Sequence, residues 1–283
     1  MTDERIHRAV SADGTEIAGR VEGDGPPLVL VHSVPHDGDI AWEAMLPHLT
    51  DRFTCYLPSL RGVGLSGDNP DHSPPRLQED VNSFVDSIAE PVCLVGFSTS
   101  GPLVLGAAIN GGAVPAVAVY DLLVGSVMRE EDLASLGAML EQMGAAATEG
   151  RLVDAARTSH RHAATDDEFT ALEAGYLGGA YFERCAQIVP AALQWVQQGA
   201  AYDGPLSTDP EMLAQIAAPV LLLRGQETLP WLGTALANSE QHAAHHVADL
   251  HVREPLAGLG HYAPLLAPER IARELISFFE LVR

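Results

Sequence analysis

The chain has 283 residues, of which 47% are hydrophobic and 19% charged, as in an ordinary soluble globular protein. Its 16 basic and 38 acidic residues leave a net charge of −22, which argues against nucleic acid or an anionic membrane as the partner. The polar start resembles no signal peptide, and no apolar run is long enough to cross a bilayer. Cys55, Cys93 and Cys185 have unrelated spacings and suit buried thiols, so we expect a cytoplasmic protein.

Short apolar runs alternate with helical stretches over the first part of the chain. In chain order we expect a hairpin (5–22), a buried strand (28–33), a helix (40–49), a strand (53–59), a helix (74–89), a strand (91–97), a helix (101–110) and a strand (114–121). In the helix 74–89 the apolar positions Leu77, Val81, Phe84, Val85 and Ile88 have helical spacing. This alternation predicts a mostly parallel sheet covered by helices on both faces.

The alternation stops after residue 121. Residues 122–215 are rich in Ala, Leu, Met, Glu and Gln, which indicates helices, and a strand (219–225), a helix ending near 246, a strand (250–254) and a last helix (268–282) then follow. A helical block between two strands of one sheet predicts a cap. We therefore expect a core formed by residues 1–121 and 216–283 and a helical cap formed by residues 122–215.

The segment Gly96-Phe97-Ser98-Thr99-Ser100-Gly101 lies directly after an apolar strand and directly before a helix. A sharp turn between a strand and a helix lifts a serine clear of the sheet and strains its backbone, as in a nucleophile elbow. Only small residues fit two positions either side of the serine, and Gly96 and Ser100 meet that requirement. Ser98 is therefore the candidate nucleophile.

Four motifs in order resemble the α/β-hydrolase superfamily over essentially the whole chain. They are VLVHSVP (29–35), RGVGLS (61–66), GFSTSG (96–101) and GLGH (258–261). The resemblance implies a mostly parallel eight-stranded sheet with helices on both faces and an inserted helical cap. It also implies catalysis by a Ser–His–acid triad, which requires neither a metal nor an organic cofactor.

Ser98 needs a base, and the resemblance places His261 over the elbow in the chain order Ser, acid, His. The usual position of the acid holds Thr228, so two candidates remain open: Asp121 at the end of its strand, and Glu227. Three further histidines, His242, His245 and His246, have the spacing of a metal site but fit a solvated helix end.

The resemblance assigns the oxyanion hole to the backbone amides of Val34 and Thr99. Ser33 stands where relatives have a glycine, His32 suits a structural hydrogen bond, and His36 lies beside the hole. The cap adds apolar and aromatic side chains that suggest a hydrophobic ligand. The residues expected to line the substrate pocket are Ser33, His36, Met139, Met143, Trp195 and Trp231.

These residues favour a serine hydrolase that cleaves an ester, thioester or lactone of a medium-sized hydrophobic molecule. Two alternatives stay open: a non-hydrolytic enzyme of the same fold (a cofactor-free oxygenase, a perhydrolase or haloperoxidase, a carbon–carbon-cleaving enzyme or a cyclase), and a non-catalytic small-molecule-binding protein. Epoxide hydrolysis and dehalogenation need an aspartate at the position of Ser98. We expect a monomer or a homodimer.

Overall fold

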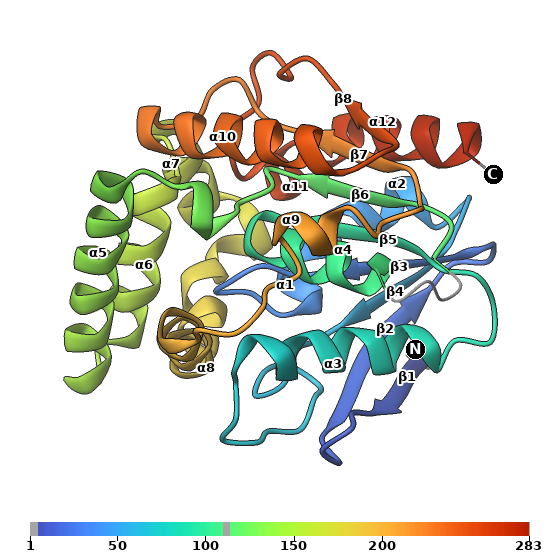
Figure 1. Ribbon diagram of the computed structural model, residues 1–283. Coiled ribbons are helices and arrows are strands. Elements are labelled where there is room, and N and C mark those ends of the chain that lie inside the picture. The colour runs from blue at the N-terminus through green and yellow to red at the C-terminus, as the bar shows by residue number, and fades with distance from the viewer. Residues whose placement is uncertain (1–4, 110–113, 283) are drawn as a thin grey trace.

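A single sheet forms the centre of the protein in the computed structural model, which describes residues 5–109 and 114–282 (Figure 1). Its strand order is β1-β2-β4-β3-β5-β6-β7-β8, and all pairings are parallel except those of β2 with β1 and β4. The strands are β1 (Arg5–Val10), β2 (Glu16–Glu22), β3 (Pro27–Val31), β4 (Thr54–Pro58), β5 (Cys93–Phe97), β6 (Val117–Tyr120), β7 (Val220–Leu223) and β8 (Leu250–Val252).

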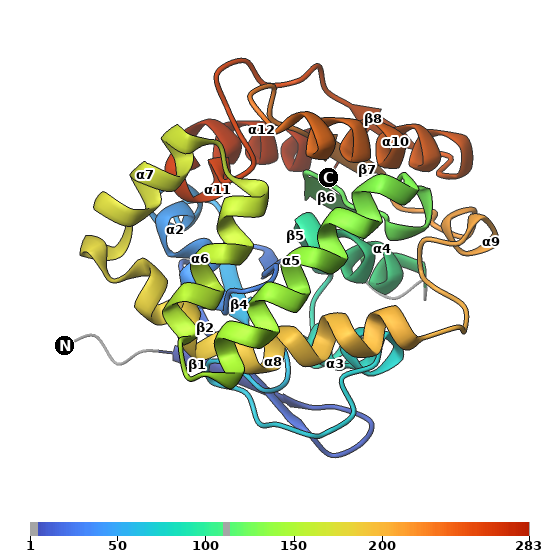
Figure 2. The ribbon, with the colours of Figure 1, turned by 90° about the vertical axis from the view of Figure 1, so that its left-hand side faces the viewer.

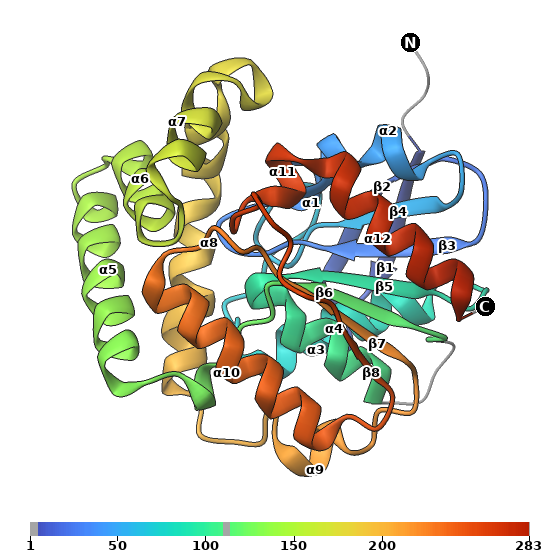
Figure 3. The same ribbon diagram turned by 90° about the horizontal axis from the view of Figure 1, so that it is seen from above.

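Two groups of helices cover the two faces of the sheet, as the view from above shows (Figure 3). One face carries α1 (Gly38–Trp42), α2 (Leu46–Leu49), α11 (Ala263–Leu266) and α12 (Pro268–Leu281), and the other carries α3 (Pro74–Asp86), α4 (Gly101–Ile109), α9 (Pro210–Leu213) and α10 (Pro230–His246). Since both faces are covered, every residue of β3, β5, β6 and β7 is buried, which explains their continuous apolar runs. This confirms the predicted fold class.

One predicted helix is broken into pieces. Residues 40–49 form the end of α1, the 3₁₀ turn η1 (Glu43–Met45) and α2 instead of one continuous helix. Pro47 lies in the first turn of α2, where its missing N–H requires no intrahelical partner, whereas inside a continuous helix it would remove a hydrogen bond and clash with the preceding turn. The prediction of helical structure here is correct, but the prediction of one continuous helix is wrong because of Pro47.

A block of helices lies between β6 and β7. It contains η3 (Gly125–Val127), α5 (Glu130–Thr148), α6 (Leu152–Ala163), α7 (Asp166–Ala174), η4 (Tyr176–Gly179) and α8 (Tyr181–Ala201). Seen from their own side, α5, α6 and α8 lie in front of the sheet (Figure 2). These helices form the cap. Within the described residues, no helix has the length and apolar character needed to cross a membrane.

The register of the parallel strands β3, β5 and β6 brings the loops of the predicted site together. Val31 at the end of β3 pairs with Gly96 of β5, and Phe97 pairs with Tyr120 at the end of β6. Because these strands are parallel, the segments that follow them leave the sheet at the same edge. The loop after β3, the turn after β5 and Asp121 after β6 are therefore neighbours.

Candidate active site

Ser98 occupies a strained turn between β5 and α4. Its φ is 54°, in the left-handed region that side chains other than glycine rarely adopt, and the 3₁₀ turn η2 (Ser98–Ser100) leads directly into α4. Gly96 has no room for a side chain, because a Cβ there would lie 2.7 Å from Cγ2 of Val104. The chain thus has the backbone conformation that the sequence predicts for a nucleophile elbow.

Ser100 replaces the second glycine of the elbow, and its hydroxyl both accepts and donates a hydrogen bond within the protein. Its Oγ accepts a hydrogen bond from the Phe97 amide at 2.8 Å and lies 2.7 Å from the Val31 carbonyl, to which it can donate. The side chain is buried. Ser100 therefore ties the end of β5 to the end of β3 and has no proton left for chemistry.

His261 and Asp121 form a buried pair beside the elbow. His261 Nδ1 lies 2.7 Å from Asp121 Oδ2, and the Gly225 amide donates to Oδ1 at 3.1 Å. The two side chains are 6% and 0% exposed. Burial raises the pKa of Asp121 above its ordinary value, while the hydrogen bond from His261 opposes that rise. Because an ionised carboxylate only accepts, Nδ1 carries the hydrogen and Nε2 is left as a proton acceptor.

The two acid candidates are separated by their geometry. Asp121 contacts the His261 ring directly, whereas Glu227 has an exposed side chain and uses its backbone amide to bond the Leu259 carbonyl at 2.8 Å. The His261 ring also packs on Phe97, with the ring centroids 5.0 Å apart. Since Phe97 precedes Ser98, the imidazole lies next to the elbow.

Glu168 of α7 supports the loop that carries His261, which sequence reasoning did not foresee. Its Oε1 accepts a hydrogen bond from the Tyr262 amide at 2.7 Å, and a Cβ added to Gly260 would lie 2.3 Å from the same oxygen. Burial raises the pKa of Glu168. The cap therefore contacts the histidine loop through a buried carboxyl group.

The loop after β3 brings Val34 to Thr99. The Val34 amide donates to Thr99 Oγ1 at 3.2 Å, so both residues assigned to the oxyanion hole are in contact. His32 fixes this loop, because its Nδ1 lies 3.1 Å from the Ser33 carbonyl and its Nε2 accepts from the Leu60 amide at 2.9 Å. His32 thus has the structural hydrogen bonds that the sequence suggested.

A buried chain of hydrogen bonds connects the same loop to the cap. His160 Nδ1 lies 2.7 Å from the Ala156 carbonyl, and Tyr181 Oη lies 2.7 Å from the Nε2 atoms of both His160 and His36. His36 Nδ1 lies 3.1 Å from Ser33 Oγ. Because a carbonyl only accepts, the hydrogens have one consistent order: Ser33 donates to His36, His36 to Tyr181, Tyr181 to His160, and His160 to Ala156.

Both histidines of this chain are held neutral. Burial holds the pKa of His36 well below its ordinary value, and it lowers the pKa of His160 to about 4. A ligand atom from each ring and Cys185 Sγ all lie within 4.8 Å of one another, a spacing that suits a transition metal. However, the Tyr181 hydroxyl already satisfies the Nε2 atom of each ring, so the nitrogens have their partners without an ion.

The six residues predicted to line the substrate pocket do not lie together. Ser33 and His36 belong to the buried chain, and Met143 is buried in the core. Met139 borders a groove between α5 and α6. Trp195 packs on His32, at 5.9 Å between ring centroids, and Trp231 packs on His162, at 4.5 Å. These are mainly packing and hydrogen-bonding positions.

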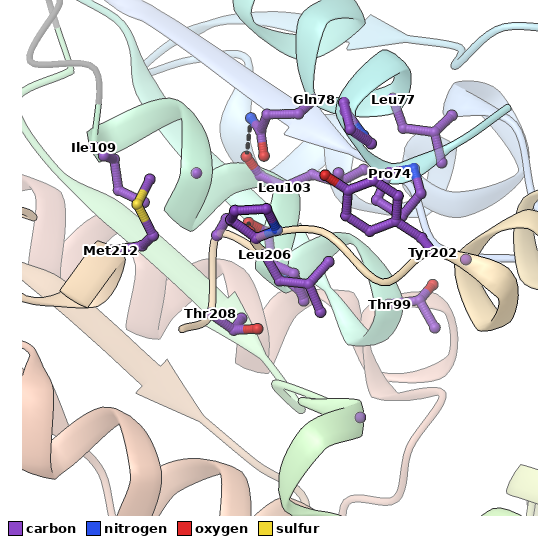
Figure 4. A pocket seen from close by; sticks show the side chains of 17 residues that line it. Pro74, Leu77, Gln78, Thr99, Leu103, Ile109, Tyr202, Leu206, Thr208 and Met212 are labelled. Atoms are coloured by element: carbon purple, nitrogen blue, oxygen red, sulfur yellow. Dashed lines mark hydrogen bonds between the residues drawn. The ribbon is translucent and has the colours of Figure 1, made fainter. Parts of the chain in front are cut away.

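An apolar cavity borders the elbow at a different place (Figure 4). It has a volume of about 530 Å³ and lies between α3, α4 and the segment 202–212 that returns from the cap. Thr99 borders it, and none of its 17 lining residues carries a charged side chain. Its wall includes Leu77, Leu103, Ile109, Tyr202, Leu206 and Met212. None of the six residues predicted from the sequence is among these 17.

Some known proteins resemble part of this sequence, and others share its fold. A pyrrolizixenacetamide deacetylase of Xenorhabdus hominickii is 26% identical over 129 residues (44% of this chain and 46% of the relative), and a soluble epoxide hydrolase of Corynebacterium sp. (strain C12) is 30% identical over 101 residues (36% and 33%). The chain thus matches less than half the length of these curated relatives.

A solved structure, the esterase RhEst1 from Rhodococcus sp. ECU1013, has the same fold with a TM-score of 0.72 and 22% identity, over 98% of this chain and 99% of that chain. The family model described as the alpha/beta hydrolase family matches residues 28–274, which include the elbow, Asp121 and His261. The chain belongs to the alpha/beta hydrolase family.

Proposed function

We propose that this protein is a serine hydrolase that cleaves an ester, thioester or lactone of a medium-sized hydrophobic molecule through an acyl-enzyme. The observation that carries the proposal is the 2.7 Å contact between His261 Nδ1 and Asp121 Oδ2, buried beside a serine with φ of 54°. This pairing leaves His261 Nε2 free to accept the proton of the Ser98 hydroxyl.

The reaction then has two balanced halves. The Ser98 oxygen attacks the carbonyl carbon while its proton moves to His261 Nε2, and Asp121 stabilises the imidazolium that forms. Collapse of the tetrahedral intermediate breaks the bond to the leaving alkoxide or thiolate, which takes the proton from His261. Water repeats the sequence on the acyl-enzyme, which releases the acid and restores the Ser98 hydroxyl.

The cavity supports the substrate class. Thr99 directly follows Ser98 and borders a cavity without charged side chains, so a group held there is uncharged and stabilised mainly by burial of apolar surface. A volume of about 530 Å³ lies within the range of small-molecule sites. The net charge of −22 also disfavours a polyanionic substrate.

Covalent labelling tests the proposal. Incubation with a fluorophosphonate should add one phosphonyl group, detected by intact-mass spectrometry and located on Ser98 by peptide mapping. Ser98→Ala should not label, whereas Ser207→Ala, a serine of the cavity wall, should label like the wild type. A folded wild-type protein that never labels would contradict the proposal.

A second reading, non-hydrolytic chemistry on the same fold, rests on the departures at Ser33 and Ser100 from the usual glycines. It requires no acyl-enzyme. Substrate turnover by Ser98→Ala close to the wild-type rate, together with an inactive His261→Ala variant, would favour it. Ligand binding without any product would instead favour a binding protein.

A further inference from the structure

The side chain of Thr99 lies at the junction of three parts of the site. The residue directly follows Ser98, its Oγ1 accepts the Val34 amide at 3.2 Å, and it borders the apolar cavity. Thr99 is exposed, whereas Ser98 before it and Ser100 after it are buried. The hydroxyl of Thr99 is therefore open to a molecule that enters the site.

The hydrogen bond from Val34 determines what the Thr99 hydroxyl can do. A hydroxyl group that accepts one hydrogen bond still has its own hydrogen to donate. Across residues 5–109 and 114–282, no group is placed to accept that hydrogen, since the bond from Val34 is the one bond recorded for this side chain. Accepting an N–H also polarises the hydroxyl, which makes it a stronger donor.

We propose that the Thr99 hydroxyl is a catalytic residue that donates a hydrogen bond directly to the developing oxyanion. The Val34 amide would then act through Thr99 Oγ1, while the backbone N–H of Thr99 provides the second direct donor. This assignment rests on the proposed serine-hydrolase function. It differs from an oxyanion hole made only of backbone amides, because one of the two donors can be removed by mutation.

The same contact permits an opposite reading. Thr99 Oγ1 lies where a substrate oxygen would meet the Val34 amide, so the hydroxyl can instead block the hole and leave it by rotation about χ1. Threonine has two accessible χ1 rotamers in a helical environment, which makes such a rotation feasible. The two readings predict opposite effects when the hydroxyl is removed. If the hydroxyl donates to the oxyanion, its removal slows the reaction. If the hydroxyl blocks the oxyanion hole, its removal leaves the rate unchanged or raises it.

The second-order rate constant of fluorophosphonate labelling separates them, because the phosphoryl oxygen of the probe develops charge in the same place as the substrate oxyanion. Thr99→Val keeps the shape of the side chain and removes the hydroxyl, and it should label about 10²-fold more slowly than the wild type. Thr99→Ser restores the hydroxyl and should label within about fivefold of the wild type. Thr148→Val makes the same change at an exposed position on α5, outside the cavity and the elbow, and should have no effect.

Circular dichroism and the melting temperature check that each variant is folded, and Thr99→Ala replaces Thr99→Val if the valine variant is not. A Thr99→Val variant that labels as fast as the wild type, or faster, overturns the inference while the labelling of Ser98 upholds the hydrolase proposal. A wild type that does not label at all overturns the hydrolase proposal itself, and the role of Thr99 falls with it.

Discussion

Removing the Tyr181 hydroxyl should destabilise the protein more than an ordinary tyrosine-to-phenylalanine change. In Tyr181→Phe the Nε2 atoms of His36 and His160 both lose their partner. Both rings are fully buried, and each unsatisfied nitrogen costs about 1–3 kcal/mol. The rings have centroids 5.6 Å apart and pack on Phe97 and Tyr262, which restricts a direct bond between them. We expect a loss of about 3 kcal/mol in the free energy of unfolding.

Differential scanning calorimetry at pH 7.5 measures this loss, with Tyr176→Phe as the matched control. Tyr176 donates a single hydrogen bond, to the Ile40 carbonyl at 2.8 Å, so its removal should cost about 1 kcal/mol. For a protein of this size the two values correspond to melting temperatures lower by roughly 6–12 °C for Tyr181→Phe and roughly 2–4 °C for the control. Equal shifts for the two variants would refute the reasoning, since they would show that Tyr181 does not satisfy two buried groups.

Three further predictions concern the acid, the buried histidine and the cavity. Asp121→Asn should lower kcat for an acyl ester by about 10⁴-fold, because an amide does not hold the required histidine tautomer, whereas Glu227→Gln should stay close to the wild type; equal losses would contradict the assignment. Burial lowers the pKa of His160 to about 4, against about 6.5 in the unfolded chain, so its contribution to stability is complete above pH 6.5 and is lost as the pH falls toward 4. The wild type should therefore lose about 2 kcal/mol more than His160→Gln between pH 7 and pH 5 in urea unfolding, and identical pH slopes would disprove this. Finally, kcat/KM for p-nitrophenyl esters should rise about fourfold per methylene group from acetate to hexanoate, and Leu206→Trp should flatten that rise without affecting acetate; an unchanged profile would show that the chain lies outside the cavity.

The fold and the elbow could be predicted because their signals are local. The strands β3, β5 and β7 are short apolar runs bounded by turn residues, and the segment around Ser98 has small residues at both crowded positions. The acid was left open because Asp121 and Glu227 both follow strands, and spacing does not show which one reaches His261. In the structure Asp121, and not Glu227, contacts His261. Asp121 has a φ of 52°, and its carboxylate accepts a hydrogen bond from the Gly225 amide.

The contacts between cap and core could not be predicted in the same way. Tyr181 and His160 lie on different helices and meet a loop residue, His36, that is 145 positions away from Tyr181 in the sequence. A tyrosine on an apolar helix face has the same sequence pattern whether it packs or bonds. The sequence did not predict the apolar cavity, because the segment 202–212 that closes it has little periodicity. Its pattern does not show that the chain returns there from the cap to lie against α3 and α4.

Four hydroxyl groups lie around the site, that of Ser33 on the loop after β3 and those of Ser98, Thr99 and Ser100 on the turn after β5. Ser33 donates to His36, and Ser100 donates within the sheet edge, so neither proton is available. Thr99 Oγ1 accepts a hydrogen bond from the Val34 amide, and its own hydrogen is not used within the described residues. The two departures from glycine therefore form hydrogen bonds that stabilise the loops around the site. In the proposed mechanism, Ser98 instead transfers its proton to His261, and Thr99 donates a hydrogen bond to the charge that this transfer creates.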